Sequence, residues 1–117
     1  MRTSIVICFA ACMLVLPVTG HAQAPDTDSA NNVMKGCRAI LAKSKSDTFL
    51  RGLCAGTVHA IAGLAWDSDL CVPTGLTVAQ EVQVVVAYID ARSDRQHQDF
   101  RSLALEAFKE AWPCKPR

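Results

Sequence analysis

The chain has 117 residues, half of them hydrophobic, and its 12 Lys and Arg side chains stand against 11 Asp and Glu, a formal net charge of +1. Its length suits one small domain. The near balance of charge, without a basic stripe or a Lys/Arg run interleaved with aromatic residues, argues against nucleic acid as a partner.

Residues 1–24 have the pattern of a secretory signal peptide. Arg2 gives a positive start, residues 5–16 form an unbroken apolar run, and Ala22-Gln23-Ala24 fits an A-x-A cleavage site. The apolar run is too short to span a bilayer comfortably, and no stop-transfer pattern follows it. We therefore expect an exported chain that is cleaved after residue 24 and does not span a membrane.

Residues 25–31 are small and polar and predict a flexible leader, so the folded domain is expected over 32–117. From about Asn31 the apolar residues recur with a helical period. A polar turn, 43–47, interrupts this first helix. Ser46 is the expected N-cap of a second helix, with Asp47 in its first turn, where negative charge favours the helix dipole.

The second helix, over about 47–66, is apolar nearly all round, which is typical of the buried centre of a bundle. Gly52 and Gly56 stand four residues apart and Gly63 follows. Small residues at such spacing allow a close crossing with another helix. We expect a neighbour from the same domain, since Arg51 and the histidine at position 59 argue against a membrane span.

A third helix is predicted after Thr77, because Gln80 three residues later completes a capping box. The run 82–89 also has high β propensity, but no second strand-like run exists to pair with it, so a helix is favoured. A polar stretch, 90–98, separates this helix from a fourth one over about 100–111.

Four cysteines remain beyond the predicted signal peptide: Cys37, Cys54, Cys71 and Cys114. Residues equidistant from the turn of an antiparallel hairpin lie side by side, and the first two are nearly symmetric about the turn 43–47. The last two are nearly symmetric about the turn 92–98. Among the three pairings that four cysteines allow, this spacing favours 37 with 54 and 71 with 114. We therefore predict an all-α fold, a small bundle of about four helices arranged as two disulfide-linked helical hairpins.

Residues that could carry chemistry have simpler interpretations. Paired cysteines in an oxidising compartment are structural and not catalytic, and the C-x-x-C and H-x-x-x-H spacings of zinc sites are missing. His59 is more typical of a hydrogen-bonded core histidine, or of one partly open at a bundle edge, than of a ligand or base. No phosphate loop, nucleophile elbow or catalytic triad pattern occurs. We expect no enzymatic activity, metal or cofactor.

Several segments together resemble a known family. Cys71-Val72-Pro73-Thr74-Gly75-Leu76-Thr77 followed by Gln80 resembles the C-(I/V)-P-x-G-(V/L)-T-x-x-Q segment of the type VI secretion amidase immunity proteins, the Tai and Rap families. Cys54-Ala55-Gly56 and Ala111-Trp112-Pro113-Cys114 are similar to that family's C-x-G helix and its aromatic-Pro-Cys end. The likeness covers about Val33 to Cys114. The chain departs from the family after the third helix, where members often carry a short His-Pro turn that bears on the choice of partner.

The resemblance implies a periplasmic, all-helical and often dimeric protein. Such proteins bind an injected peptidoglycan amidase, whose active site uses Cys and His, and occlude its cleft without performing chemistry themselves. The expected partner is therefore a protein toxin. Two alternatives remain open: a small periplasmic stress chaperone, which other helical disulfide proteins of this size exemplify, and a small secreted enzyme or redox protein.

Two loops are candidate contact segments, because loops on stapled helices are exposed and preorganised. The loop 67–75 has too few carboxylates for a calcium site. The turn 90–98 alternates in charge, which is typical of a solvated face and also suits protein recognition. The residues that we predict to contact the partner are Asp67, Asp69, Arg92, Asp94 and Arg95.

Overall fold

The computed structural model describes residues 20, 24, 26–64 and 69–115. The predicted signal peptide therefore lies, apart from Gly20 and Ala24, outside the described residues, and so does Asp67 of the predicted contact set. The elements are α1 (Ala30–Leu41), α2 (Thr48–Gly63), α3 (Val78–Asp90), the short 3-10 helix η2 (Ser93–Arg95) and α4 (Phe100–Ala111). No strand is formed in these ranges, so the predicted all-α bundle of about four helices is confirmed, and 82–89 is helical. None of these helices has the length and hydropathy needed to cross a bilayer.

Helix α1 begins at Ala30, inside the segment predicted as a flexible leader. Ala30 is fully buried, and its N–H donates to the carbonyl of Gln98 at 2.9 Å. An isolated bridge pairs Ser29 with Asp99 beside it. The chain just before α1 is thus tied to the turn that precedes α4, which its small polar side chains did not indicate.

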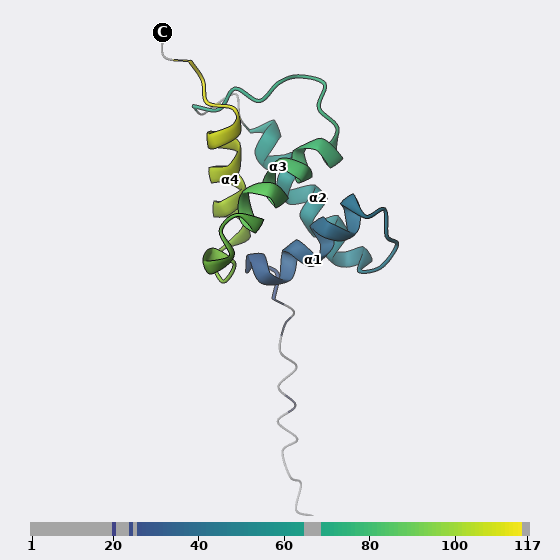
Figure 1. Cartoon of the computed structure of the whole chain (residues 1–117). Coiled ribbons are helices and arrows are strands. Elements are labelled where there is room, and N and C mark those ends of the chain that lie inside the picture. Colours follow the sequence, from purple (N-terminus) through teal and green to yellow (C-terminus); the bar gives the residue numbers. More distant parts are fainter. Residues whose placement is uncertain (1–19, 21–23, 25, 65–68, 116–117) are drawn as a thin grey trace, which may run out of the picture.

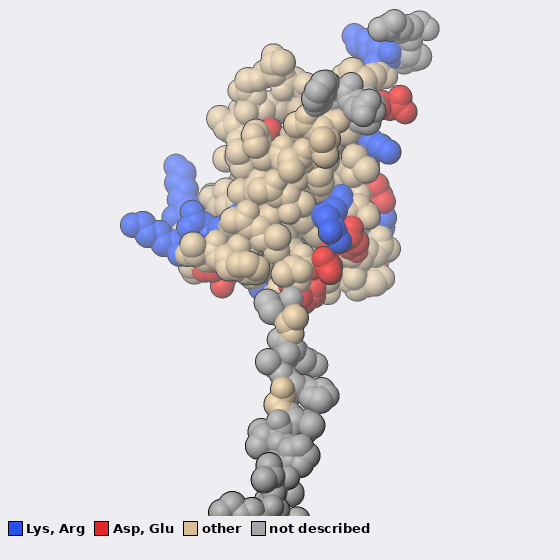
Figure 2. All heavy atoms as spheres, turned by 180° about the vertical axis from the view of Figure 1, so that it is seen from behind, with Lys and Arg blue, Asp and Glu red and all other residues tan. Residues whose placement is uncertain are grey.

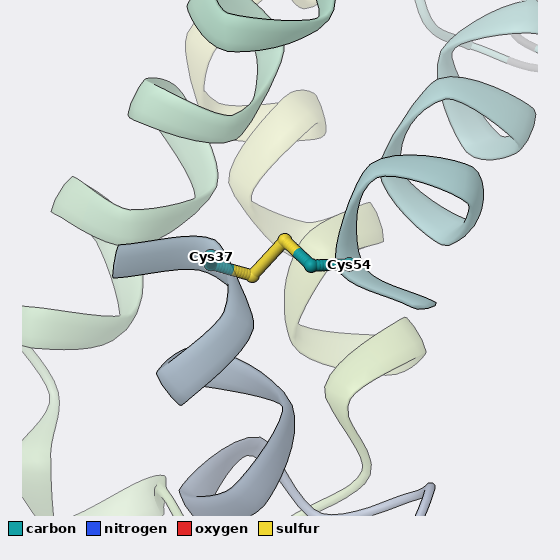
Figure 3. The surroundings of a disulfide bond; sticks show 2 residues. All are labelled: Cys37 and Cys54. Atoms are coloured by element: carbon teal, nitrogen blue, oxygen red, sulfur yellow. A yellow bond between two sulfur atoms is a disulfide. The ribbon is translucent and has the colours of Figure 1, made fainter. Parts of the chain in front are cut away.

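Helices α1 and α2 form a helical hairpin (Figure 1). Their backbones come close together at Gly36. A Cβ atom built on Gly36 would lie 2.1 Å from the carbonyl carbon and oxygen of Leu50. One residue further, the disulfide between Cys37 and Cys54 joins the two helices (Figure 3). The first predicted disulfide is therefore confirmed, and since both of its cysteines are fully buried, it lies in the core.

The second hairpin, α3 and α4, is closed by the other predicted disulfide, which joins Cys71, before α3, to Cys114, after α4. An isolated bridge between Leu70 and Pro113 aligns the two segments beside it. The hydrophobic core lies among the four helices. Its largest fully buried side chains are Phe100, Phe108, Met34, Ile89, Leu103, Val33, Val58, Val82 and Val85.

The helix starts follow local hydrogen bonding. At α3 the predicted capping box is present: Gln80 N–H donates to Thr77 Oγ1 at 3.2 Å and Thr77 N–H donates to Gln80 Oε1 at 2.8 Å. The predicted N-cap of α2 is wrong. Asp47 occupies that position in a left-handed conformation, while the N–H of Ser46 donates to Ser44 Oγ at 3.2 Å. Short polar side chains of this kind bind their own backbone in turns, in competition with helix capping.

The prediction that α2 is the buried centre of the bundle is wrong. Only Cys54 and Val58 of this helix are buried, whereas Phe49 and Leu64 are 61% and 68% exposed. The close crossing predicted at the α2 glycines is also wrong, because a Cβ atom added to any of them would meet nothing within 4 Å. That role belongs to Gly36 of α1. The core is filled mainly from α1, α3 and α4, and α2 contributes one strip to it.

Candidate interaction surface

The structure separates the two loops predicted to bind a partner. Asp69 lies beside the C-terminal end of α4, where its carbonyl accepts a hydrogen bond from the N–H of Cys114 at 3.2 Å. Arg92, Asp94 and Arg95 lie before the first residue of α4, at the opposite end of that helix (Figure 1). A helix of 12 residues is about 18 Å long. One contact patch containing both loops would therefore have to extend along all of α4.

Arg95 forms an ion pair within the molecule. Its guanidinium donates to both carboxylate oxygens of Glu106, at 2.7 and 2.9 Å, and the hydroxyl of Tyr88 donates to the same carboxylate at 2.7 Å. The hydrogen bonds from Arg95 and Tyr88 lower the pKa of Glu106 to about 2. The same contact raises the pKa of Arg95. Burial, followed by the contact with Glu106, raises the pKa of Tyr88.

Arg92 is held in a similar way. It lies over the ring of Tyr88, 3.7 Å from the centroid, and donates to the carbonyl of Tyr88 at 3.0 Å and to Glu110 at 2.9 Å. Asp94, in contrast, is exposed and makes no side-chain hydrogen bond to another described residue. The two arginines of the turn 90–98 therefore fasten it to α3 and α4, and a partner that used them would compete with these internal contacts.

An extended uncharged surface lies on α2. Six residues of α2 and its C-cap residue, Leu64, fall within about 120° of the helix circumference at 3.6 residues per turn, and none of them is buried. We call this surface the α2 face; it consists of Phe49, Gly52, Leu53, Gly56, Ala60, Gly63 and Leu64. In Figure 1, α2 lies behind α3. Figure 2 shows the molecule from behind, and a broad area of that side carries almost no Lys, Arg, Asp or Glu.

The α2 face continues into an apolar hollow toward α4. The hollow has a volume of about 360 Å³, and Leu64 belongs both to it and to the α2 face. Its other lining residues are Ile61, Leu70, Arg101, Ser102 and Leu105. The exposed apolar surface is therefore wider than one helix.

His59 lies just beyond one edge of the α2 face. Its Nδ1 is 3.1 Å from Oε2 of Glu81, a residue of α3 that is 4% exposed. Because a carboxylate only accepts hydrogen bonds, the neutral form of the imidazole carries its proton on Nδ1 and leaves Nε2 as an acceptor. The His59 side chain is 65% exposed. Of the two interpretations that the sequence allowed, the histidine at a bundle edge is correct.

Beside this pair lies a second hollow, of about 430 Å³, bounded by the loop 71–76. Glu81, the partner that fixes the histidine, was missed from the sequence. Its signal was a charged residue in the apolar strip of the third helix, between Val78 and Val85 at helical spacing. Within the described ranges, no group of three His, Cys, Asp or Glu side chains is placed to hold a metal ion. This site therefore offers a surface hydrogen-bond acceptor next to an apolar face.

Comparison with known protein families gives one match: residues 29–114 match the family described as Rap1a immunity proteins. No curated protein and no solved structure matches the chain. The matched segment includes α1 to α4 and the disulfides Cys37–Cys54 and Cys71–Cys114.

Proposed function

This chain belongs to the Rap1a immunity protein family, and we propose that it is the periplasmic immunity protein against a peptidoglycan amidase delivered by type VI secretion. The observation that carries this proposal is the family match over residues 29–114. Resemblance in the cysteine, loop and capping residues supports the amidase as the target, and the signal-like segment 1–24 supports the periplasm. Two disulfides accord with an oxidising compartment.

The mechanism that we propose is steric. The protein would cover the catalytic cleft of the effector and would not alter it chemically. Occlusion favours a binder whose surface is already in its bound shape, since less conformational freedom is then lost on association. Two disulfides, one of them wholly buried, and the clamp between Arg95 and Glu106 give this chain such rigidity.

Periplasmic co-expression tests the proposal. The product of the neighbouring gene is directed to the periplasm of a test strain, with or without this chain, and lysis is followed by optical density. We expect lysis in its absence and protection in its presence. A chain lacking residues 1–24 should not protect, and replacing them with the signal peptide of another exported protein should restore protection. Lysis that the full chain does not reduce would refute the proposal for that effector.

The exposed apolar α2 face favours one second candidate, a periplasmic chaperone that holds unfolded clients. A chaperone would suppress the aggregation of unrelated denatured proteins at low pH, which an immunity protein has no reason to do. Light scattering of two unrelated aggregating clients, with and without the purified chain, separates the two functions.

A further inference from the structure

We propose that the α2 face, with His59 at its edge, is the surface that binds the effector, and that the effector meets it with an apolar patch and a hydrogen-bond donor directed at His59 Nε2. This inference rests on the proposed function and assigns its contact surface. It replaces the two charged loops as the primary contact.

The first support is the exposure of this face within the described part of the chain: six of its seven residues are exposed, and Leu53 is partly buried. Only one strip of α2, at Cys54 and Val58, is buried in the core. The other side still carries Phe49 and Leu64, which are mostly exposed. Aromatic and aliphatic residues in such positions are typical anchors of protein interfaces. The one charged residue of α2, Arg51, is partly buried and lies on the opposite side of the helix from Phe49.

The second support comes from the glycines. Glycine at an exposed helix position destabilises a helix relative to alanine, and at Gly36 the contact with Leu50 explains it. At Gly52, Gly56 and Gly63 no described neighbour requires the missing side chain. Glycine there leaves a shallow track in which a partner's side chains can contact the backbone of α2.

The third support is His59, which also decides what kind of partner fits. The α2 face has no side-chain hydrogen-bond donor, and the neutral form of His59, with its Nδ1 bound to Glu81, offers Nε2 as an acceptor. The α2 face of a second copy of this chain, packed symmetrically through the same face, has no side-chain donor to offer His59. An unpaired acceptor that becomes buried destabilises a complex. A different protein can place a hydroxyl, an amide or a basic side chain there, and the hollow beside the loop 71–76 has room for it.

The α2 face carries no charged side chain, which indicates how its partner binds. Charged loops attract partners of opposite charge and make binding strongly dependent on salt. A partner of the α2 face needs apolar complementarity instead, so its affinity should change little with ionic strength. The turn 90–98 predicts the opposite salt dependence, which separates the two contact hypotheses.

Isothermal titration calorimetry with the purified, oxidised protein tests the proposal. The probe is the product of the neighbouring gene with its catalytic cysteine replaced by alanine. Ala60→Glu places a charge in the middle of the α2 face, and Ala87→Glu makes the same change at an exposed position of α3. His59→Ala is matched by His97→Ala, an exposed histidine in the turn before α4. We expect Ala60→Glu to weaken binding about 100-fold or more, His59→Ala about 10-fold, and both controls less than about 2-fold.

Folding and assembly controls keep the outcomes distinct. Circular dichroism verifies that each variant is folded, and Gly56→Gln, which fills the open track without adding charge, replaces Ala60→Glu if that variant unfolds. If the wild-type chain does not bind the probe, the proposed function fails for that effector. If it binds and the α2 variants bind equally well, the function stands and this surface assignment is overturned. A wild-type dimer that Ala60→Glu converts to a monomer, measured by sedimentation velocity, would assign the face to a second copy and also overturn it.

Discussion

Replacing Gly36 with alanine should destabilise the fold strongly, whereas the same substitution at Gly52 should stabilise it. Both glycines lie within helices, so the intrinsic helix preference favours alanine at each by about 1 kcal/mol. Only the environment differs. A Cβ atom on Gly36 would lie 2.1 Å from the Leu50 carbonyl carbon and oxygen, and one on Gly52 would meet nothing within 4 Å.

The magnitude at Gly36 follows from what must move. The obstacle is backbone of α2, and α1 is covalently tied to α2 at the next residue by Cys37–Cys54. Neither helix can step aside without disturbing fully buried neighbours, so we expect the upper end of overpacking costs, about 3 kcal/mol or more. Since about 1 kcal/mol shifts the melting temperature of a domain of this size by roughly 4–8 °C, Gly36→Ala should lower it by more than about 10 °C. Gly52→Ala should raise it by about 4–8 °C.

Thermal and urea unfolding of the oxidised protein, followed by circular dichroism without reductant, measures both changes. A Gly36→Ala variant as stable as the wild type would show that α1 and α2 do not approach each other at this point. A destabilised Gly52→Ala variant would show that the α2 face is covered within the folded chain, which would also remove the basis for its role in binding.

Three further outcomes follow from the side-chain contacts. The pKa of Glu106 is lowered in the folded state to about 2, so its stabilising contribution is present above the unfolded-state pKa of about 4.3 and is lost as the pH falls through the folded value. Glu106→Gln should therefore flatten the dependence of the unfolding free energy on pH between about 4.5 and 2. A slope equal to that of the wild type would contradict the ion pair between Glu106 and Arg95. Mild reductant should reduce Cys71–Cys114 before Cys37–Cys54, because Cys71 is exposed and both cysteines of the other bond are fully buried. Alkylation of the freed thiols followed by mass mapping shows the order of reduction, and labelling of Cys37 first would be the contrary result. Replacing both cysteines of one disulfide with alanine should lower the free energy of unfolding by about 3 kcal/mol for Cys37–Cys54, with its 17-residue separation, and by about 4 kcal/mol for Cys71–Cys114, with its 43-residue separation. Urea unfolding measures both changes, and a variant as stable as the wild type would contradict this expectation.

The sequence predicted the fold where the signal was local or symmetric. Thr77 and Gln80 fix the start of α3 through contacts three residues apart, and the spacing of the four cysteines about two turns identified both disulfides. These features need no knowledge of how the two hairpins pack against each other.

The orientation of α2 could not be predicted in the same way. A helix that is apolar nearly all round has no polar side to mark the solvent, so its buried strip is decided by the shape of its neighbours. Glycine in a helix is equally ambiguous: Gly52 and Gly56 looked like a crossing point and are open, whereas Gly36, an isolated glycine, is the crossing.

The candidate site shows the same limit. Alternating charge at Arg92, Asp94 and Arg95 indicated a solvated or recognising turn, but the acids that bind the two arginines are 18 and 11 residues away on α4. The partnership of His59 with Glu81 spans 22 residues and two helices. Such contacts depend on tertiary packing, and the five charged residues remain a prediction that the α2 variants will test.

Stoichiometric inhibition is the most direct test of the account as a whole. The purified chain is titrated into a fixed amount of the active amidase encoded by the neighbouring gene, and cleavage of peptidoglycan fragments is followed by chromatography. We predict that activity falls linearly to zero near one chain per enzyme, and that Ala60→Glu abolishes this inhibition whereas Ala87→Glu does not. Full amidase activity in the presence of a several-fold excess of the oxidised, folded wild-type chain would contradict it.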